Sequence, residues 1–244
     1  IKGQAVRDLV AFGNSLGIPV KYVCLVDYAN SRGAMDMGAS FELLPGYHAD
    51  PKPGLSLQQM LASTELNLLW VVGANPLQHE GLASDKAFVI AHSLFLDETA
   101  QRADLIFPSA SSYEKNGTFT NVTGQVQRLK AAIKTMGTKP DLEIFGLLAK
   151  EMGPEAIRGV GVWSHDVQFN EIRASVRGYN VALPVILTGG AAKTMPVNGP
   201  VPVEVQRDWI HSAGDTLFTS GSLGRFCKTL TSVPEFPGAL YRQQ

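Results

Sequence analysis

Short apolar runs alternate with amphipathic stretches along the first 158 residues of the chain. Residues 68–72 form a continuous apolar run that Gly73 closes, which predicts a strand buried on both faces of a parallel sheet. Apolar runs at 87–91 and 104–108 predict two further strands, with a helical turn at 99–103 between them. This order predicts an α/β fold with a doubly wound, mostly parallel sheet.

Amphipathic spacing and turn residues predict the remaining elements. Helices are expected over residues 2–16, over 56–61 with Ser56 as the cap, and over 140–153. A strand is expected at 20–26, a polar loop at 30–38 and a basic connecting segment at 125–133.

The composition changes near residue 159, where prolines begin to interrupt short apolar pieces. We therefore divide the chain into a partial α/β domain, residues 1–158, and an irregular extended C-terminal tail, residues 159–244. Ordering a residue costs about 1 to 2 kcal/mol, so a tail without its own core is expected to dock on the domain or on a partner subunit. Because the chain begins at Ile1, we expect it to be one piece of a longer polypeptide.

Charge and cysteine content exclude several classes of function. The net charge is -1 and no run of five or more Lys or Arg occurs, so no nucleic-acid partner is expected. No apolar stretch approaches about 18 residues, so no direct membrane insertion is expected. Cys24 and Cys227 are isolated, which argues against an iron–sulfur cluster or a zinc site built by this chain alone.

The best candidate for ligand binding is the loop Gly73-Ala74-Asn75-Pro76, which follows the first predicted sheet strand. In open α/β sheets ligands bind beyond the carboxyl ends of the strands, and a glycine there lets backbone N–H groups approach a phosphate or ribose. The same four residues are also ordinary turn formers, so a plain strand-to-loop turn is the alternative interpretation.

Other polar residues favour structural roles, and no catalytic residue or metal ligand is predicted. Asp97 and Glu98 stand at a predicted helix start, where carboxylates favour capping. Glu114 and Lys115 are neighbours on an extended segment and point to opposite faces, which favours surface or loop-anchoring roles over acid–base chemistry. The five histidines lack metal-ligand spacing, and the serines at 109, 111 and 112 lack a nucleophile-elbow motif.

Five motifs in a fixed order over residues 73–128 carry a family resemblance. They are Gly73-Ala74-Asn75-Pro76, 95–100 (FLDETA), 103–108 (ADLIFP), 114–121 (EKNGTFTN) and 126–128 (VQR). In this order and separation they resemble the molybdopterin oxidoreductase superfamily. The resemblance implies that the Gly73–Pro76 loop corresponds to the turn that holds the guanine dinucleotide half of the pterin cofactor.

Outer motifs point to one branch of that superfamily. Residues 30–38 (NSRGAMDMG), 44–47 (LPGY) and 215–225 (DTLFTSGSLGR) are similar to the C-terminal part of the large iron–sulfur subunit of bacterial respiratory complex I, the NADH-quinone oxidoreductase. This similarity implies a structural, non-catalytic part of the peripheral arm of a complex that transfers electrons from NADH to quinone. The Gly73–Pro76 loop would then be vestigial.

The same resemblance implies the surroundings of the chain. No cofactor would be bound by this chain, and iron–sulfur clusters would lie elsewhere in the subunit or complex. The partners would be other peripheral-arm subunits, including the iron–sulfur part of the same subunit. The complex would sit at the cytoplasmic face of the bacterial inner membrane.

Two alternatives remain open. The chain could be a fragment of a catalytic molybdopterin guanine dinucleotide enzyme, such as a formate dehydrogenase or nitrate reductase, with the cofactor at Gly73–Pro76. The other alternative is a free-standing nucleotide-binding module.

Overall fold

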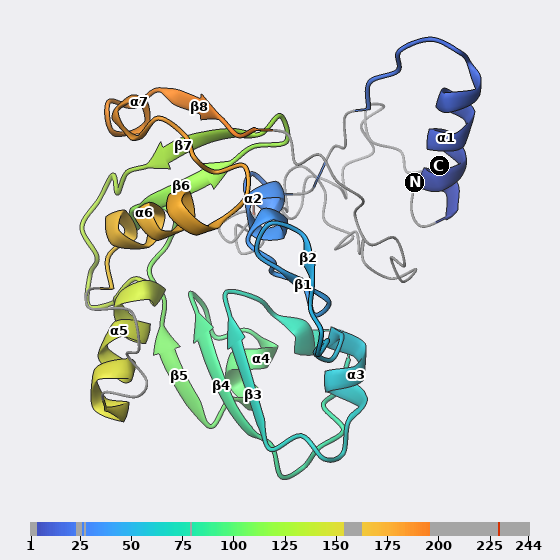
Figure 1. The fold of residues 1–244 in the computed structure, drawn as a ribbon. Helices are drawn as coiled ribbons and strands as arrows, with labels where there is room; N and C mark the ends of the chain where they lie inside the picture. Colours follow the sequence, from blue (N-terminus) through green and yellow to red (C-terminus); the bar gives the residue numbers. More distant parts are fainter. Residues whose placement is uncertain are drawn as a thin grey trace.

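The computed structural model describes residues 4–22, 26, 28–78, 80–153, 163–195 and 229 (Figure 1). Its helices are α1 Gln4–Ser15, α2 Ser31–Asp36, α3 Leu57–Ala62, η1 Pro76–Gln78 (a 3-10 turn), α4 Glu98–Arg102, α5 Asp141–Met152, α6 His165–Ser175 and α7 Leu183–Leu187. Its strands are β1 Leu43–Leu44, β2 His48–Ala49, β3 Leu68–Val72, β4 Phe88–Ser93, β5 Leu105–Pro108, β6 Gly117–Thr120, β7 Gln125–Leu129 and β8 Ala191–Lys193.

The three predicted sheet strands form a parallel sheet in the order β3-β4-β5. Val71 of β3 stands opposite Ala91 of β4, and Ala91 stands opposite Ile106 of β5. In Figure 1 the arrowheads of all three strands point toward the part of the molecule that holds α2 and β6. The prediction of an α/β fold built on a parallel sheet is confirmed.

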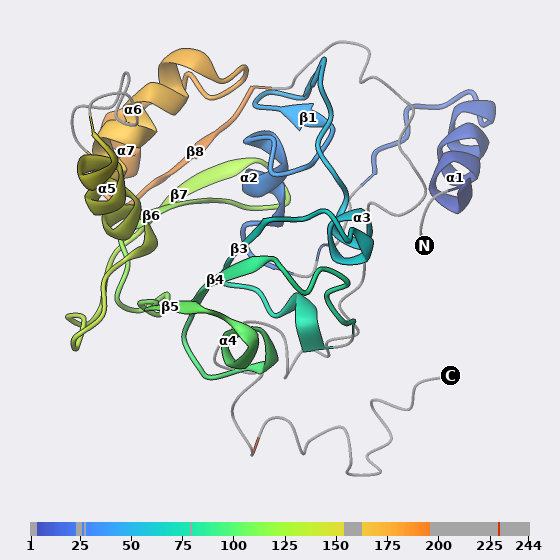
Figure 2. The same ribbon diagram turned by 90° about the horizontal axis from the view of Figure 1, so that it is seen from below.

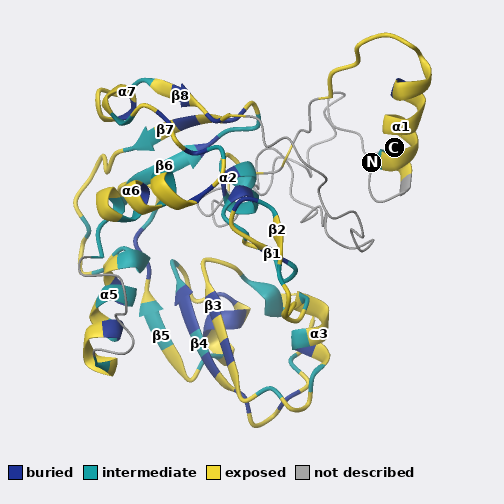
Figure 3. Ribbon diagram, in the orientation of Figure 1, coloured by how far each residue is buried: buried dark blue, intermediate teal, exposed yellow. Residues whose placement is uncertain are grey.

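The burial of β3 differs from the prediction. Leu69 and Val71 are buried and form a cluster with Leu61 of α3 and Val89 of β4 (Figure 3). The alternate residues of the strand, Trp70 among them, are exposed. Side chains alternate across a strand, so this one is buried on a single face, and the expectation of burial on both faces is wrong.

Local capping chemistry sets the predicted helices. Ser56 caps α3 with a reciprocal capping box, in which the Ser56 hydroxyl accepts from the Gln59 amide and the Gln59 side chain accepts from the Ser56 amide. Helix α5 follows Pro140 and ends at Gly153, as predicted. Helix α1 is present as predicted and stands apart from both larger sheets (Figures 1 and 2).

A second sheet, which the sequence did not predict, is antiparallel with the order β6-β7-β8. The stretch 125–133, expected to be a connecting segment, supplies its central strand β7. The irregular tail expected from residue 159 is wrong for residues 163–195, which form α6, α7 and β8 and pack a core around Val126 and Phe169. The proposed boundary at 158/159, like residues 196–228 and 230–244, lies outside the described residues.

Two smaller expectations also change. The segment 30–38, expected to be a polar loop, contains helix α2. Of the strand expected at 20–26, residues 20–22 and 26 are described and form no strand. Among the described residues, no helix has the length and apolar character needed to cross a membrane.

Candidate functional site

The Gly73–Pro76 loop leaves the carboxyl end of β3, as predicted, and it presents bare backbone. Gly73 adopts φ +65°, and a Cβ built on it would meet no atom within 4 Å. Its N–H donates to the carbonyl of His92 on β4 at 2.9 Å, so the β3–β4 pairing continues into the loop. Ala74 is exposed, and among the described residues its N–H has no acceptor. An exposed amide beside a glycine in this conformation is suited to a phosphate or ribose oxygen.

Asn75 faces the protein rather than solvent and ties the loop to α4. Its Oδ1 accepts from the amide of Thr99 at 3.1 Å and from the Thr99 hydroxyl at 2.8 Å. Its Nδ2 donates to Glu98 Oε2 at 2.6 Å. The Thr99 hydroxyl in turn accepts from the amide of Leu77 at 3.2 Å, and Thr99 is fully buried. Of the predicted loop residues, Gly73 and Ala74 are therefore exposed at the edge of the sheet, and Asn75 ties the loop to α4.

The capping prediction at α4 is confirmed. The Asp97 carboxylate accepts from the amide of Ala100 at 2.8 Å and from the Ser93 hydroxyl at 3.0 Å. The carboxyl end of β4 and the start of α4 are thus joined, next to the end of β3. The loop and α4 form one hydrogen-bonded unit at the carboxyl edge of the parallel sheet.

Asp141, the first residue of α5, is a polar hub that the sequence did not single out as a site. Its Oδ1 accepts from the Ser109 hydroxyl at 2.7 Å and lies 3.2 Å from His92 Nδ1. Its Oδ2 pairs with Lys115 Nζ at 2.5 Å. Burial raises the pKa of Asp141, but the hydrogen bonds from Lys115 and Ser109 and the charge of Lys115 outweigh it and hold that pKa below its ordinary value.

Aromatic rings enclose the histidine of this hub. His92 is fully buried, with ring centroids of Trp70 at 5.8 Å, Phe107 at 5.0 Å and Phe145 at 5.2 Å. Its Nε2 has no partner among the described residues. The hub anchors α5 to the ends of β4 and β5, which gives Lys115 a structural role.

Glu114 also anchors a loop, as expected for that residue. Its carboxylate accepts from the amide of Ser111 at 2.7 Å. Hydrogen bonding to Ser111 is the main reason that the pKa of Glu114 lies below its ordinary value. Neither member of the Glu114-Lys115 pair is arranged for acid–base chemistry with the other.

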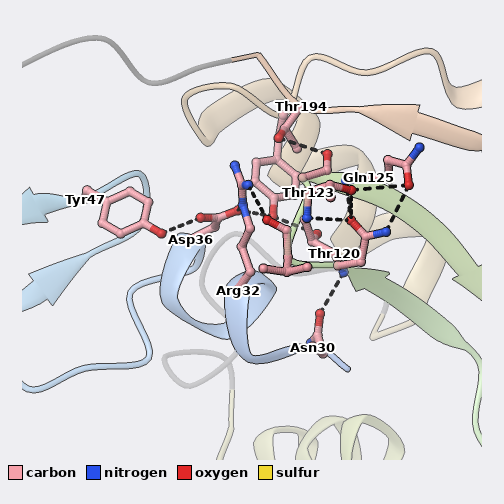
Figure 4. A network of polar contacts seen from close by, with 12 residues as sticks. Asn30, Arg32, Asp36, Tyr47, Thr120, Thr123, Gln125 and Thr194 are labelled. Carbon is pink, nitrogen blue, oxygen red and sulfur yellow. Dashed lines mark hydrogen bonds and ion pairs between the residues drawn. The ribbon is translucent and has the colours of Figure 1, made fainter. Parts of the chain in front are cut away.

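A second polar network, missed by the sequence reasoning, centres on Asp36 at the end of α2 (Figure 4). Tyr47 donates to Asp36 Oδ1 at 2.6 Å, and Tyr179 donates to Asp36 Oδ2 at 2.7 Å. Arg32 Nε lies 3.6 Å from the same Oδ2. Thr120 of β6 shares a hydrogen bond of 2.8 Å with the Tyr179 hydroxyl. Burial, followed by the contact with Asp36, raises the pKa of Tyr47, and burial is likewise the largest cause of the raised pKa of Tyr179.

The Asp36 network joins two of the passages that carried the resemblance, residues 30–38 and 114–121. The Asn30 side chain accepts from the amide of Thr120 at 2.8 Å, and Arg32 Nη1 donates to the carbonyl of Val122 at 3.0 Å. The only sequence signal for this contact was that both passages are polar and glycine-punctuated. Within the described ranges, no three His, Cys, Asp or Glu residues gather as a metal site would require. Cys24 and Cys227 lie outside those ranges.

The loop geometry fits the nucleotide half of a pterin dinucleotide. Gly73 and Ala74 offer exposed backbone at the carboxyl edge of a parallel sheet, and the space where a Cβ of Gly73 would lie is open. These two residues would hold the group. When bound, the pterin and its metal would supply the redox chemistry. The described residues include no group of three His, Cys, Asp or Glu that could hold a metal ion.

The parallel sheet, the glycine loop at its carboxyl edge and the capped helix α4 define an α/β protein built on a parallel sheet. More specifically, the chain belongs to the molybdopterin oxidoreductase family, whose model matches residues 6–151.

Two curated relatives are named formate dehydrogenase subunits. The chain is 35% identical over 150 residues to the F420-dependent formate dehydrogenase 1 subunit alpha of Methanococcus maripaludis, a match that covers 51% of this chain and 22% of the relative. It is 31% identical over 150 residues to the F420-dependent formate dehydrogenase subunit alpha of Methanocaldococcus jannaschii, with 51% and 22% covered. The chain therefore spans about a fifth of the length of these relatives.

Proposed function

We propose that this chain is a domain of a molybdopterin-dependent oxidoreductase of the formate dehydrogenase type, and that its Gly73–Pro76 loop contacts the nucleotide half of a molybdopterin guanine dinucleotide. The observation that carries the proposal is the loop itself. A glycine at φ +65° and the Ala74 amide, for which the described residues supply no acceptor, stand at the carboxyl edge of the sheet, held there by Asn75.

The relatives support the formate dehydrogenase proposal over the complex I interpretation that the outer motifs favoured. The curated relatives described above are named formate dehydrogenase subunits. Because the match covers 22% of each of them, oxidation of formate is a proposal for the whole protein and not for this chain alone.

A structural role in complex I is the second candidate, and residues 30–38 with 44–47 favour it. In the structure these residues build the Asp36 network rather than the loop at the sheet edge, so they are compatible with a scaffold. Under this candidate the loop binds no pterin, and the subunit works beside iron–sulfur subunits at the cytoplasmic face of the inner membrane.

Analysis of the intact subunit for molybdenum and for a guanine-containing pterin separates the two. Stoichiometric amounts of both, with formate-dependent reduction of a dye, are expected under the first candidate. Iron–sulfur clusters without pterin, in a preparation that oxidises NADH with quinone, would support complex I instead.

A loop variant tests the role of Gly73. Gly73→Val adds a side chain in the left-handed region and blocks the open face of the loop, so it should lower the pterin content of the subunit. Gly81→Val is the matched control, because a Cβ at Gly81 also meets no atom within 4 Å and its φ is not positive. Equal pterin content in both variants would contradict the assignment of the loop.

A further inference from the structure

A pocket of about 200 Å³ lies at the Asp36 network, away from the Gly73 loop. Its lining includes Arg32, Asp36, Tyr47, Arg177, Tyr179 and Thr194. The lining comes from α2, the β1–β2 hairpin, the connection between α6 and α7, and the residues after β8. Residues far apart in sequence, such as Asp36 and Thr194, thus meet at one place (Figure 4).

The carboxylate in this pocket is already engaged by protein contacts on both oxygens. One Asp36 oxygen accepts from Tyr47, and the other accepts from Tyr179 and faces Arg32. Asp36 is 5% exposed. Its protein contacts therefore satisfy this residue, and it offers little to a metal ion or to a ligand amine.

The guanidinium of Arg32, by contrast, has N–H donors for which the described residues supply no acceptor. A guanidinium carries five N–H donors, and among the described residues Arg32 donates one hydrogen bond, to the carbonyl of Val122. Its side chain is 35% exposed, so these donors are within reach of a molecule that enters the pocket. The ion pair with Asp36 fixes the plane of the guanidinium without using the whole donor set.

Two glycines leave room for the arginine side chains of this pocket: Gly124 lies beside Arg32, and Gly46 lies beside Arg177. A Cβ on Gly124 would lie 3.0 Å from Arg32 Nη2 and 2.8 Å from Thr194 Oγ1, and Gly124 adopts φ +81°. A Cβ on Gly46, in the hairpin turn, would lie 3.3 Å from the Cβ of Arg177. The second arginine is thus held against the hairpin, beside Tyr47.

We propose that this pocket binds the phosphate group of a phosphomonoester, with Arg32 and Arg177 as its donors. The described lining residues include two guanidinium groups and one carboxylate, and the planar fork of arginine matches the oxygens of a phosphate. The volume is below the roughly 300 to 1,000 Å³ of pockets that take a whole drug-sized ligand, so it suits a headgroup and not an entire dinucleotide. The site is separate from the proposed loop function and does not rest on it.

Calorimetric titration of the intact subunit at low salt tests the site with two probes, inorganic phosphate and glycerol 1-phosphate. Arg177→Gln should weaken binding about tenfold or more, because it removes a charged hydrogen-bond donor from an exposed side chain without touching the Asp36 contacts. Arg102→Gln, on α4 and outside the pocket lining, is the control and should leave the affinity within about twofold.

Arg32→Lys is a second test variant. It retains the positive charge but removes the planar guanidinium with its paired N–H donors. It should weaken phosphate binding while thermal unfolding shows that the subunit remains folded. Tighter binding of glycerol 1-phosphate than of inorganic phosphate identifies an ester as the ligand. Equal affinity for inorganic phosphate and glycerol 1-phosphate, failure of inorganic phosphate to bind at about 10 mM, or equal weakening by Arg177→Gln and Arg102→Gln would overturn the proposal.

Discussion

The side chain of Asn75 should contribute more to stability than an asparagine beside a loop normally does. In Asn75→Ala, the Thr99 amide and hydroxyl both lose their acceptor, at a residue with 0% exposure. Each neutral hydrogen bond contributes about 0.5 to 1.5 kcal/mol, and a buried donor left without a partner costs about 1 to 3 kcal/mol. The contact with Glu98 is exposed and adds little. We expect Asn75→Ala to lower the free energy of unfolding by about 2 to 3 kcal/mol.

Urea unfolding followed by tryptophan fluorescence measures this loss, because Trp70 lies on β3 just before the loop. The matched control is Asn67→Ala, which removes an exposed asparagine side chain just before the same strand. Among the described residues, Asn67 takes part in a hydrogen bond only through its backbone carbonyl. A double-mutant cycle with Thr99→Val should give a coupling of about 1 kcal/mol. If Asn75→Ala and Asn67→Ala agree within about 0.5 kcal/mol, the loop is not held by Asn75 in the way described.

Three further outcomes follow from the same structure. The pKa of Asp141 is depressed, so its stabilising effect is present above the ordinary value of about 3.9 and is lost as the pH falls through the lower folded value. Asp141→Asn should therefore lose about 1.5 to 3 kcal/mol at pH 7 and show a flatter acid limb when unfolding is measured from pH 3 to 7. Gly73→Ala should cost about 1 kcal/mol through its positive φ, whereas Gly81→Ala should cost nothing or stabilise slightly in the same urea assay. The pKa of Tyr179 is raised by burial and then by Asp36, so its contribution is present below about pH 10 and is lost above it; Tyr179→Phe should reduce the alkaline loss measured between pH 8 and 11.

Local signals predicted the elements whose ends are set by local chemistry. Ser56 caps α3 as the sequence predicted, and Pro140 and Gly153 bracket α5. Asp97 caps α4 as expected. In each case the deciding contact joins residues only a few positions apart, so it can be read from the order of residues.

Tertiary contacts explain what was missed. The sequence predicted a basic connecting segment where β7 lies. Only Val126 of the five strand residues is buried, so the sequence lacks the apolar alternation of a half-buried strand. The strand forms because it pairs with β6 and β8. Helix α6 buries only Phe169, so it has no amphipathic stripe that would reveal it. Its local signals were the cap Ser164, the acidic Asp166 in the first turn and the basic Arg173 in the last turn. The partners of Asp36 were not predictable, because no spacing rule links it to Tyr179, 143 positions further along the chain.

The candidate site was predicted in part. The position of the Gly73–Pro76 loop at the end of a parallel strand follows from the apolar run and the glycine, and the structure places it there. The inward direction of the Asn75 side chain was not predictable, because it depends on the position of α4. Whether the loop binds a nucleotide stays a prediction.

The contact between Asp36 and Tyr179 also affects the order in which this protein can be made. During synthesis, Asp36 and Tyr47 leave the ribosome long before Tyr179, and β8 follows later still. Contacts between such distant positions close late, since a long loop must be ordered first. Until then Asp36 lacks one phenol donor and the β7 edge lacks its β8 partner, which leaves an unpaired strand edge open to wrong pairing. Completion of the second half of the fold is therefore tied to the arrival of residues 179–193.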